Sequence, residues 1–249
     1  MRQRFSVLAC ALSVALSVQC VRATHPEAET PTQTALRFFI DHSDETIEQF
    51  LSRYRPVPID APLRSRVLES FPHDINVVNP SQEMRKKMAV AERVVRYSGR
   101  SGVMTFKVVA DDAAYAALYF RAILLISTRT LDLLTADELA AVTAHELGHD
   151  FEWTEYWNAV TQRDYRRLQQ LELRSDGVAV LTLQAIGLSP ERLASATIKM
   201  TRFNESRERG TNAGANDGTR PRYVSLKERI AFIRAVARLK WAKRSPCAR

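Results

Sequence analysis

The chain has 249 residues, a formal net charge of +8 and only three cysteines. This length suits one domain with its own hydrophobic core, or such a domain with a helical appendage. The arginines are scattered between acids rather than gathered in a basic stripe with interleaved aromatics. We therefore expect no nucleic-acid partner.

The first 23 residues have the composition of an export signal. Arg2 and Arg4 form a basic start, residues 5–18 form a short apolar run, and the segment 21–23 offers a small-residue cleavage site ending at Ala23. Because the apolar run is short for a transmembrane helix, we expect cleavage after Ala23 and a periplasmic or secreted protein. A retained N-terminal membrane anchor is the alternative.

Cleavage there would change both the cysteine content and the charge. Cys247 would be the single remaining cysteine of about 226 residues, so we expect no internal disulfide. Three arginines and no acids would leave, which lowers the net charge to +5. Such a charge allows a weak association with an anionic envelope surface, although ordinary solubility explains it equally well. The sequence does not indicate an oligomeric state.

The first elements in chain order are short and helical. We expect a loose tether over residues 24–43, a helix over 44–53, a proline-rich break, and a short helix over 64–70. Residues 81–97 have the apolar periodicity of an amphipathic helix. We assign residues 24–78 to an N-terminal tether with short helices, 79–240 to one domain, and 241–249 to a basic tail.

Two strands and a capped helix should follow. Residues 103–109 and 122–127 are rich in β-branched and aliphatic residues, which favours strands, while residues 111–120 form either a helical turn or part of a long hairpin. Thr135 and Glu138 form a capping box. The helix that this box opens should reach about residue 150.

The rest of the chain should again be helical. We expect a long helix that begins near residue 157 or 163 and ends at 186, before Gly187, and a further helix from about 189 to 203. Residues 204–222 are rich in Gly, Asn and Arg and should form an exposed, mobile loop. A second capping box over 225–228 opens a helix to about 239. The order of elements predicts a mainly helical α+β fold.

The segment His145-Glu146-Leu147-Gly148-His149 is the strongest functional signal. Residues four apart lie on one face of a helix, so both imidazoles can bind one metal ion. Glu146 is placed to take a proton from a metal-bound water. This pattern is typical of zinc hydrolases, and we expect one Zn²⁺ per chain.

Glu172 is the candidate for the third ligand, because no histidine follows His149. Glu172 and Asp176 are four apart within an otherwise apolar stripe, and buried acids are costly unless they are paired or bind metal. The alternative is an ion-paired face, since arginines lie nearby at positions 166, 167 and 174.

The remaining roles follow from the same chemistry. Glu146 would act as the general base, and Asp176 would orient one imidazole by accepting its second N–H. Asp150 either does the same or is a helix-end residue. The contacts to the substrate and to a developing oxyanion stay open among Tyr156, Arg220, Arg222 and Tyr223.

Together with Glu172 and Asp176, the histidine motif gives the sequence pattern HExxH plus ExxxD. This pattern resembles that of the glutamate zincins. Its flanks, 131–142, 172–177 and 225–230, resemble the HtpX and CAAX-prenyl-endopeptidase family of zinc metallopeptidases, over roughly residues 80–235. The resemblance implies a zincin-like domain in which an extended peptide pairs with an edge strand beside the motif helix. That strand would be Arg121–Ser127, with Ile123 and Leu125 in contact with the substrate.

The chain departs from this family in three places. The gap from His149 to Glu172 is short, the segment before the edge strand is Asp111 to Tyr115 instead of the usual Asn- and Pro-Gly-bearing one, and Arg220-Pro221 replaces a common His-Pro pair. We therefore expect a small exported zinc metalloendopeptidase that hydrolyses peptide bonds through a Glu-activated, zinc-bound water. The alternatives are a non-catalytic, metal-stabilised binding or chaperone-like module of the cell envelope, and a hydrolase of a non-peptide amide in the cell wall.

Overall fold

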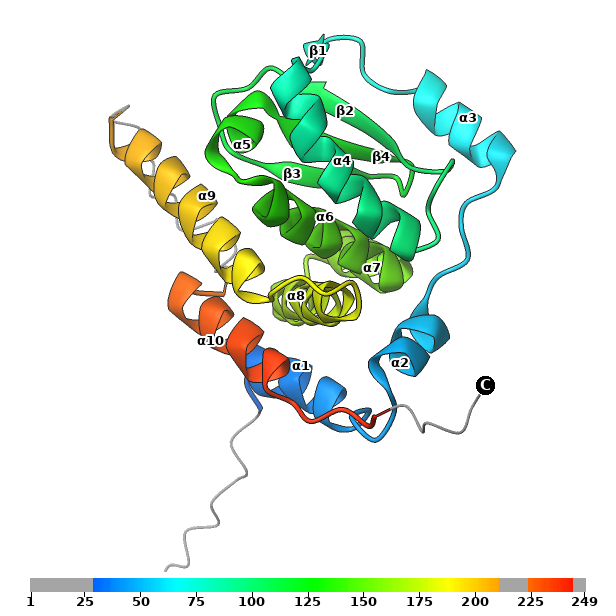
Figure 1. Ribbon diagram of the computed structural model, residues 1–249, viewed down its shortest axis with the longest axis vertical. Coiled ribbons are helices and arrows are strands. Elements are labelled where there is room, and N and C mark those ends of the chain that lie inside the picture. The colour runs from blue at the N-terminus through cyan, green and yellow to red at the C-terminus, as the bar shows by residue number, and fades with distance from the viewer. Residues whose placement is uncertain (1–28, 211–223, 244–249) are drawn as a thin grey trace, which may run out of the picture.

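The computed structural model describes residues 29–210 and 224–243, which form ten helices and one four-stranded sheet (Figure 1). The expected signal segment, Cys247 and the candidates Arg220, Arg222 and Tyr223 lie outside these residues. The expectation of a mainly helical α+β fold is confirmed. The elements are α1 (Pro31–Ile40), α2 (Ile47–Tyr54), α3 (Ala61–Glu69), β1 (Val77–Val78), α4 (Gln82–Tyr97), β2 (Thr105–Val109), β3 (Ala116–Tyr119), β4 (Ile123–Ser127), α5 (Thr128–Leu133), α6 (Ala136–Phe151), α7 (Trp153–Gln162), α8 (Tyr165–Ala185), α9 (Glu191–Gly210) and α10 (Leu226–Ala237).

The sheet has the strand order β1-β2-β4-β3, so β4 is an inner strand. It runs parallel to β2 on one side and antiparallel to β3 on the other. The expectation that Arg121–Ser127 is the edge strand is therefore wrong. All five residues of β4 are buried, which explains why the segment is a continuous aliphatic run rather than an alternating one.

Ile123 and Leu125 contribute to the core instead of a substrate groove. Both belong to a cluster with Ile59, Val67 and Phe71, which come from α3 and the segments that flank it. The exposed edge beside α6 is β3 (Figure 1), which forms the hairpin that we expected as one of two options for residues 111–120.

Residues 31–40 of the expected loose tether form helix α1 instead. Thr30 and Gln33 form a capping box that begins α1, and Phe39 of this helix is fully buried. The Phe39 ring lies against Gly177 of α8, where an added Cβ would come within 2.1 Å of a ring carbon. Helix α1 therefore packs on the same helix that carries Glu172 and Asp176.

Of the two starts expected for the long helix, the one near residue 163 is confirmed, because α8 begins at Tyr165. Arg163 adopts a left-handed conformation with φ of 56° and ends the separate helix α7. One further helix differs from expectation. Helix α9 continues to Gly210, so residues 204–210 are helical rather than part of a loop. The capped starts of α6 and α10 are confirmed, and α4, for which only a helix over 81–97 was expected, is capped by Ser81.

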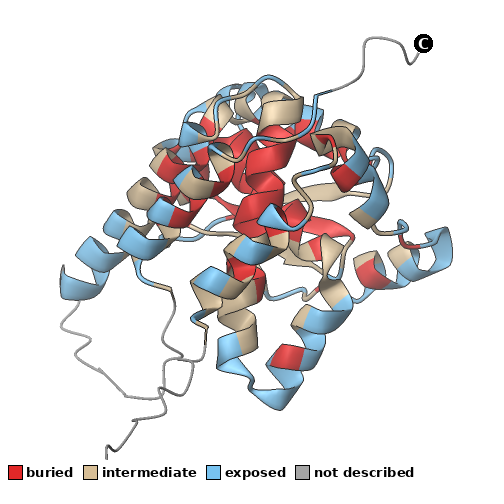
Figure 2. Cartoon of the chain, turned by 90° about the horizontal axis from the view of Figure 1, so that it is seen from below, coloured by how far each residue is buried: buried red, intermediate tan, exposed pale blue. Residues whose placement is uncertain are grey.

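Helix α6 is the centre of the molecule and packs against α4, α8 and α9. Buried residues gather on these central elements, whereas the outlying helices are largely exposed (Figure 2). Within the described ranges, no helix combines the length and the apolarity that a membrane crossing needs.

Candidate metal centre

Three side chains from two helices converge beside α6. His145 and His149 come from α6 and Glu172 from α8, and one ligand atom of each lies within 4.8 Å of the others. The Nε2 atom of His145 lies 3.6 Å from one carboxylate oxygen of Glu172, and the Nε2 atom of His149 lies 3.6 Å from the other. Ligands about 2.1 Å from a tetrahedral zinc are roughly 3.4 Å apart, so this donor set fits such an ion with little movement.

Gly148 allows the two helices to come this close. A Cβ at this position would lie 2.7 Å from the backbone oxygen of Ser175 and 2.8 Å from its Cα. Backbone atoms cannot rotate out of the way as the end of a side chain can. The glycine inside the histidine motif therefore sets the distance between the two histidines and Glu172.

Both imidazoles are held from the side that faces away from Glu172. The Nδ1 atom of His145 lies 2.9 Å from Asp176, and that of His149 lies 3.1 Å from the Ser175 hydroxyl. A metal-binding histidine usually has such a partner for its second nitrogen, which fixes the orientation of the ring. The sequence indicated Asp176 for this place and missed Ser175.

Arg229 of α10 is a further residue that the sequence analysis missed. Its guanidinium donates hydrogen bonds to both oxygens of Asp176, at 2.6 and 2.8 Å, and its Nη2 atom is 3.3 Å from the ring nitrogens of His145. Burial alone would raise the pKa of Asp176, but Arg229 and His145 outweigh it and lower the pKa to about 2. A fully buried carboxylate needs a positively charged partner. The burial expected for Asp176 is therefore the signal that could have pointed to an arginine.

Glu146 lies between the metal ligands and the edge strand. It is 8 % exposed, and one of its oxygens accepts a hydrogen bond of 3.0 Å from the backbone N–H of Leu118 in β3. Burial, assisted by the nearby Glu172 carboxylate, raises the pKa of Glu146 to about 7. A carboxyl group in this range is suited to exchange protons near neutral pH.

The ionisation of two of the three candidate ligands, Glu172 and His149, suits a cation; for His145, burial alone would lower the pKa, but Asp176 outweighs it and raises the pKa. Burial alone would raise the pKa of Glu172, but His149 and His145 lower it below its ordinary value. Burial lowers the pKa of His149 to about 4, so its imidazole is neutral at pH 7. Metal binding requires this combination of an ionised carboxylate and a neutral imidazole.

The neighbouring charged residues serve other contacts. Asp150 forms ion pairs with Arg100 and Arg121, so of the two options for this residue the structure favours the helix-end one. The three arginines that suggested an ion-paired face around Glu172 bind elsewhere: Arg166 binds the Glu29 carbonyl, Arg167 binds Glu155 and Arg174 binds Glu152. The ring centroid of Tyr156 lies 5.0 Å from that of His149.

A cavity of about 230 Å³ adjoins the candidate ligands. His145, Glu146 and Arg229 form one side, and the other walls come from α6, α9 and the segment that enters β3. Its apolar lining includes Val142, Leu193 and Met200. The described residues thus combine a candidate metal-ligand set, a carboxylate with a raised pKa, an exposed strand edge and a pocket.

Comparison with known proteins supports the same class. The mainly helical fold with its small mixed sheet is consistent with a zincin-like metallopeptidase domain, and residues 81–154 match the model of peptidase family M48. The match runs from the start of α4 into α7 and includes the histidine motif, but it ends before Glu172. It supports a metallopeptidase of that family. A search of curated proteins gave no match.

Proposed function

We propose that the chain is a zinc-dependent metalloendopeptidase that acts on proteins or peptides outside the cytoplasm. The observation that carries the proposal is the convergence of His145, His149 and Glu172 at separations that suit zinc, with Glu146 beside them. The narrower resemblance to HtpX and CAAX-prenyl endopeptidases rests on the sequence motifs. Export rests on the composition of residues 1–23.

His145, His149 and Glu172 would hold the zinc, which when bound supplies a Lewis acid and lowers the pKa of water. Asp176 and Ser175 keep the imidazole rings in the orientation that turns both Nε2 atoms toward Glu172. Arg229 keeps Asp176 ionised, so that this carboxylate can accept the Nδ1–H of His145. Each contact fixes a donor before the ion arrives.

Glu146 would move the proton in the reaction. Its carboxylate takes a proton from the attacking water and later gives it to the leaving amine of the peptide. The backbone N–H of Leu118, which now donates to Glu146, belongs to the strand beside which the substrate would lie. Substrate binding would therefore take place at β3, and not at the inner strand β4 that the sequence suggested.

The test of this function combines metal analysis with one substitution. We expect the purified protein to bind one zinc ion and to cleave an unfolded substrate such as casein, and Glu146→Gln to keep the zinc and to cleave at least about 100-fold more slowly. Glu205→Gln, on the exposed face of α9, is the matched control and should behave as the wild type. Stoichiometric zinc without Glu146-dependent cleavage would instead favour a metal-stabilised binding or chaperone-like module.

A further inference from the structure

The edge strand β3 turns alternate residues toward its neighbour β4. Tyr115 accepts a hydrogen bond of 3.1 Å from the N–H of Ser127, and Tyr119 accepts one of 3.1 Å from the N–H of Ala122. Because backbone groups alternate along a strand, the intervening residues 114, 116 and 118 direct theirs to the open side. These three residues are the positions that face a peptide at the sheet edge, although the N–H of Leu118 already donates to Glu146.

Asn204 of α9 already occupies the first of these positions. Its side-chain oxygen accepts the N–H of Ala114 and its amide nitrogen donates to the carbonyl of Ala114, both at 2.9 Å. One amide thus satisfies both outward groups of Ala114, as the backbone of a neighbouring strand would. We call this pair of hydrogen bonds the Asn204 clasp.

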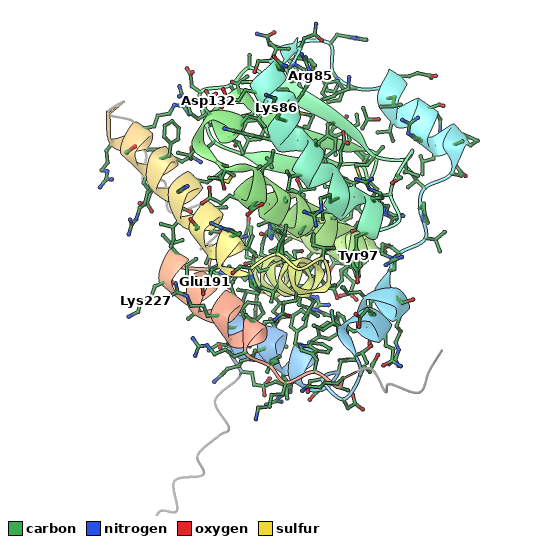
Figure 3. The ribbon with its side chains drawn as sticks, in the orientation of Figure 1. Arg85, Lys86, Tyr97, Asp132, Glu191 and Lys227 are labelled. Carbon is green, nitrogen blue, oxygen red and sulfur yellow. The ribbon has the colours of Figure 1, made fainter. Side chains whose placement is uncertain are left out.

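The helix that carries the clasp is fixed to the rest of the fold. Glu138 of α6 accepts hydrogen bonds from Ser195 at 2.6 Å and from Lys199 at 2.8 Å. Glu191, at the start of α9 beside α10 (Figure 3), accepts a hydrogen bond of 3.0 Å from Arg234. The Asn204 clasp is therefore carried by a helix that is fixed to the rest of the fold. An incoming peptide would have to displace Asn204 in order to pair with Ala114.

The cavity beside Glu146 lies along the part of the edge that the clasp closes. Its lining includes both Ala114 and Asn204, together with Val142, Leu193 and Met200. A cavity of about 150 Å³ can hold a benzene ring, whereas pockets for drug-sized ligands begin at about 300 Å³. A space of about 230 Å³ therefore suits one large apolar side chain.

The opposite end of β3 is open and aromatic. Phe120 follows the strand and is 44 % exposed, and its ring centroid lies 5.7 Å from that of Trp157, which stacks on Trp153. The two ends of the edge thus differ: one is occupied by an amide from α9, and the other continues onto an exposed aromatic surface.

We propose that the Asn204 clasp ends the substrate-binding edge at Ala114, so that a peptide pairs only with Ala116 and with the carbonyl of Leu118, whose N–H is bonded to Glu146, and inserts one large apolar side chain into the cavity. Glu146 is hydrogen-bonded to Leu118, so the cleaved bond would lie beside Leu118. Antiparallel pairing, the commoner arrangement in sheets, then places the residue that follows this bond toward Ala116 and the cavity. Recognition then extends mainly over residues that precede the cleaved bond. The inference rests on the proposed peptidase function and adds the substrate class.

A series of synthetic peptides around one mapped casein cleavage site tests this inference. We expect kcat/KM of the wild type to change less than about twofold when residues are added beyond the second after the cleaved bond, and to rise about tenfold when the peptide is lengthened before it. With Asn204→Ala, the groups of Ala114 become available, and the same C-terminal extension should raise kcat/KM by about two- to tenfold, as one or two hydrogen bonds allow. Glu205→Ala is the matched control and should keep the wild-type profile.

Two further measurements keep a folding defect apart from the proposed role. Hydrogen exchange of residues 111–119 should accelerate at Ala114 in Asn204→Ala while α6 stays protected, and Met200→Ala should shift the preference after the cleaved bond toward bulkier residues. Equal gains from extension on both sides of the cleaved bond in the wild type, or an unchanged length profile in a folded Asn204→Ala, would overturn the inference alone. Absence of Glu146-dependent cleavage in the wild type would overturn the proposed function and this inference with it.

Discussion

Asp150 and Asp176 are both buried on neighbouring helices, and both are bound by arginine. Asp150 at the end of α6 pairs with Arg100 and Arg121, while Asp176 on α8 is shared between Arg229 and His145. Both are at most 2 % exposed. One contact, that to His145, therefore separates an aspartate that can act on the metal from one that cannot.

The partners of each aspartate show what it connects. Arg100 also donates to the carbonyl of Pro56 at 2.9 Å, and Arg121 to that of Val57 at 2.7 Å, so Asp150 ties the end of α6 to the segment after α2. Asp176 instead connects α8 and α10 to an imidazole of α6. The comparison predicts that substitutions around Asp176 change metal affinity, and that substitutions around Asp150 change the stability of the fold.

The largest effect on the metal side should come from Glu172→Gln. Loss of one of the three ligands should lower zinc affinity by roughly 100- to 1,000-fold, since zinc binding of about 10–16 kcal/mol is shared among few ligands. Competition with a chromophoric chelator measures the change, and Glu205→Gln serves as the exposed control. An affinity within about threefold of the wild type would show that the third ligand lies elsewhere.

On the other side of the comparison, Asp150→Asn should destabilise the fold by about 3 kcal/mol, because it leaves two arginine charges without their partner. Zinc affinity of the folded protein should stay within about twofold. Urea unfolding of the metal-free protein and chelator competition measure the two quantities. A loss of zinc affinity without a loss of stability would reverse the roles of the two aspartates.

Asp176→Asn should weaken zinc binding, in addition to the loss of stability that comes from leaving Arg229 without its partner. We expect zinc affinity to fall about 10- to 100-fold, the usual range for a residue that orients a metal-bound imidazole. Arg229→Lys keeps the positive charge but cannot make the bidentate contact with Asp176, so it should lower zinc affinity less than Asp176→Asn does. If both variants bind zinc as the wild type does, the contact between Asp176 and His145 does not support the metal.

Gly148→Ala tests the approach of α6 and α8, on which the metal side depends. The added methyl group meets the backbone of Ser175, so we expect about 2 kcal/mol of destabilisation together with weaker zinc binding. Asn158→Ala, at an exposed position of α7, is a suitable control for a substitution within a helix. Wild-type stability and zinc affinity in Gly148→Ala would mean that the helices can separate without cost.

The smallest effect should be the pH dependence around Glu138, which lies away from both aspartates. Burial alone would raise the pKa of Glu138, but hydrogen bonds from Lys199, Ser195 and Thr135 outweigh it and lower the pKa to about 2. Its contribution to stability is therefore complete above the ordinary value of 4.5 and is lost as the pH falls toward 2. The difference in unfolding free energy between wild type and Glu138→Gln, measured by urea with chelator present, should shrink over this range. A constant difference would contradict the lowered pKa.

Local patterns predicted the parts of the site that one helix carries. The capping box at Thr135 placed the start of α6, and the four-residue spacing placed two histidines on one face of it. Glu172 and Asp176 also followed from spacing, because acids in an apolar stripe are conspicuous. Their roles in a reaction stay a proposal that the experiments above test.

Such local sequence patterns could not predict contacts between segments that are far apart in the sequence. Arg229 lies 53 residues after Asp176, and although it falls in the stretch 225–230 that resembles the family, no spacing or periodicity pairs it with Asp176. The edge strand was misassigned because the aliphatic run of β4 is more conspicuous than the alanine-rich β3, although full burial on both faces is what produces that run. Helix α1 was missed because its threonines and proline resembled a tether, while the same residues form its N-terminal cap.

Diffraction from crystals of the zinc-loaded protein, recorded at the zinc absorption edge, would locate the metal and its ligands. We predict one anomalous peak about 2.0–2.2 Å from Nε2 of His145, Nε2 of His149 and a carboxylate oxygen of Glu172, with Glu146 outside the ligand set. A peak that lacks any of these three ligands, or no peak beside α6, would contradict the account.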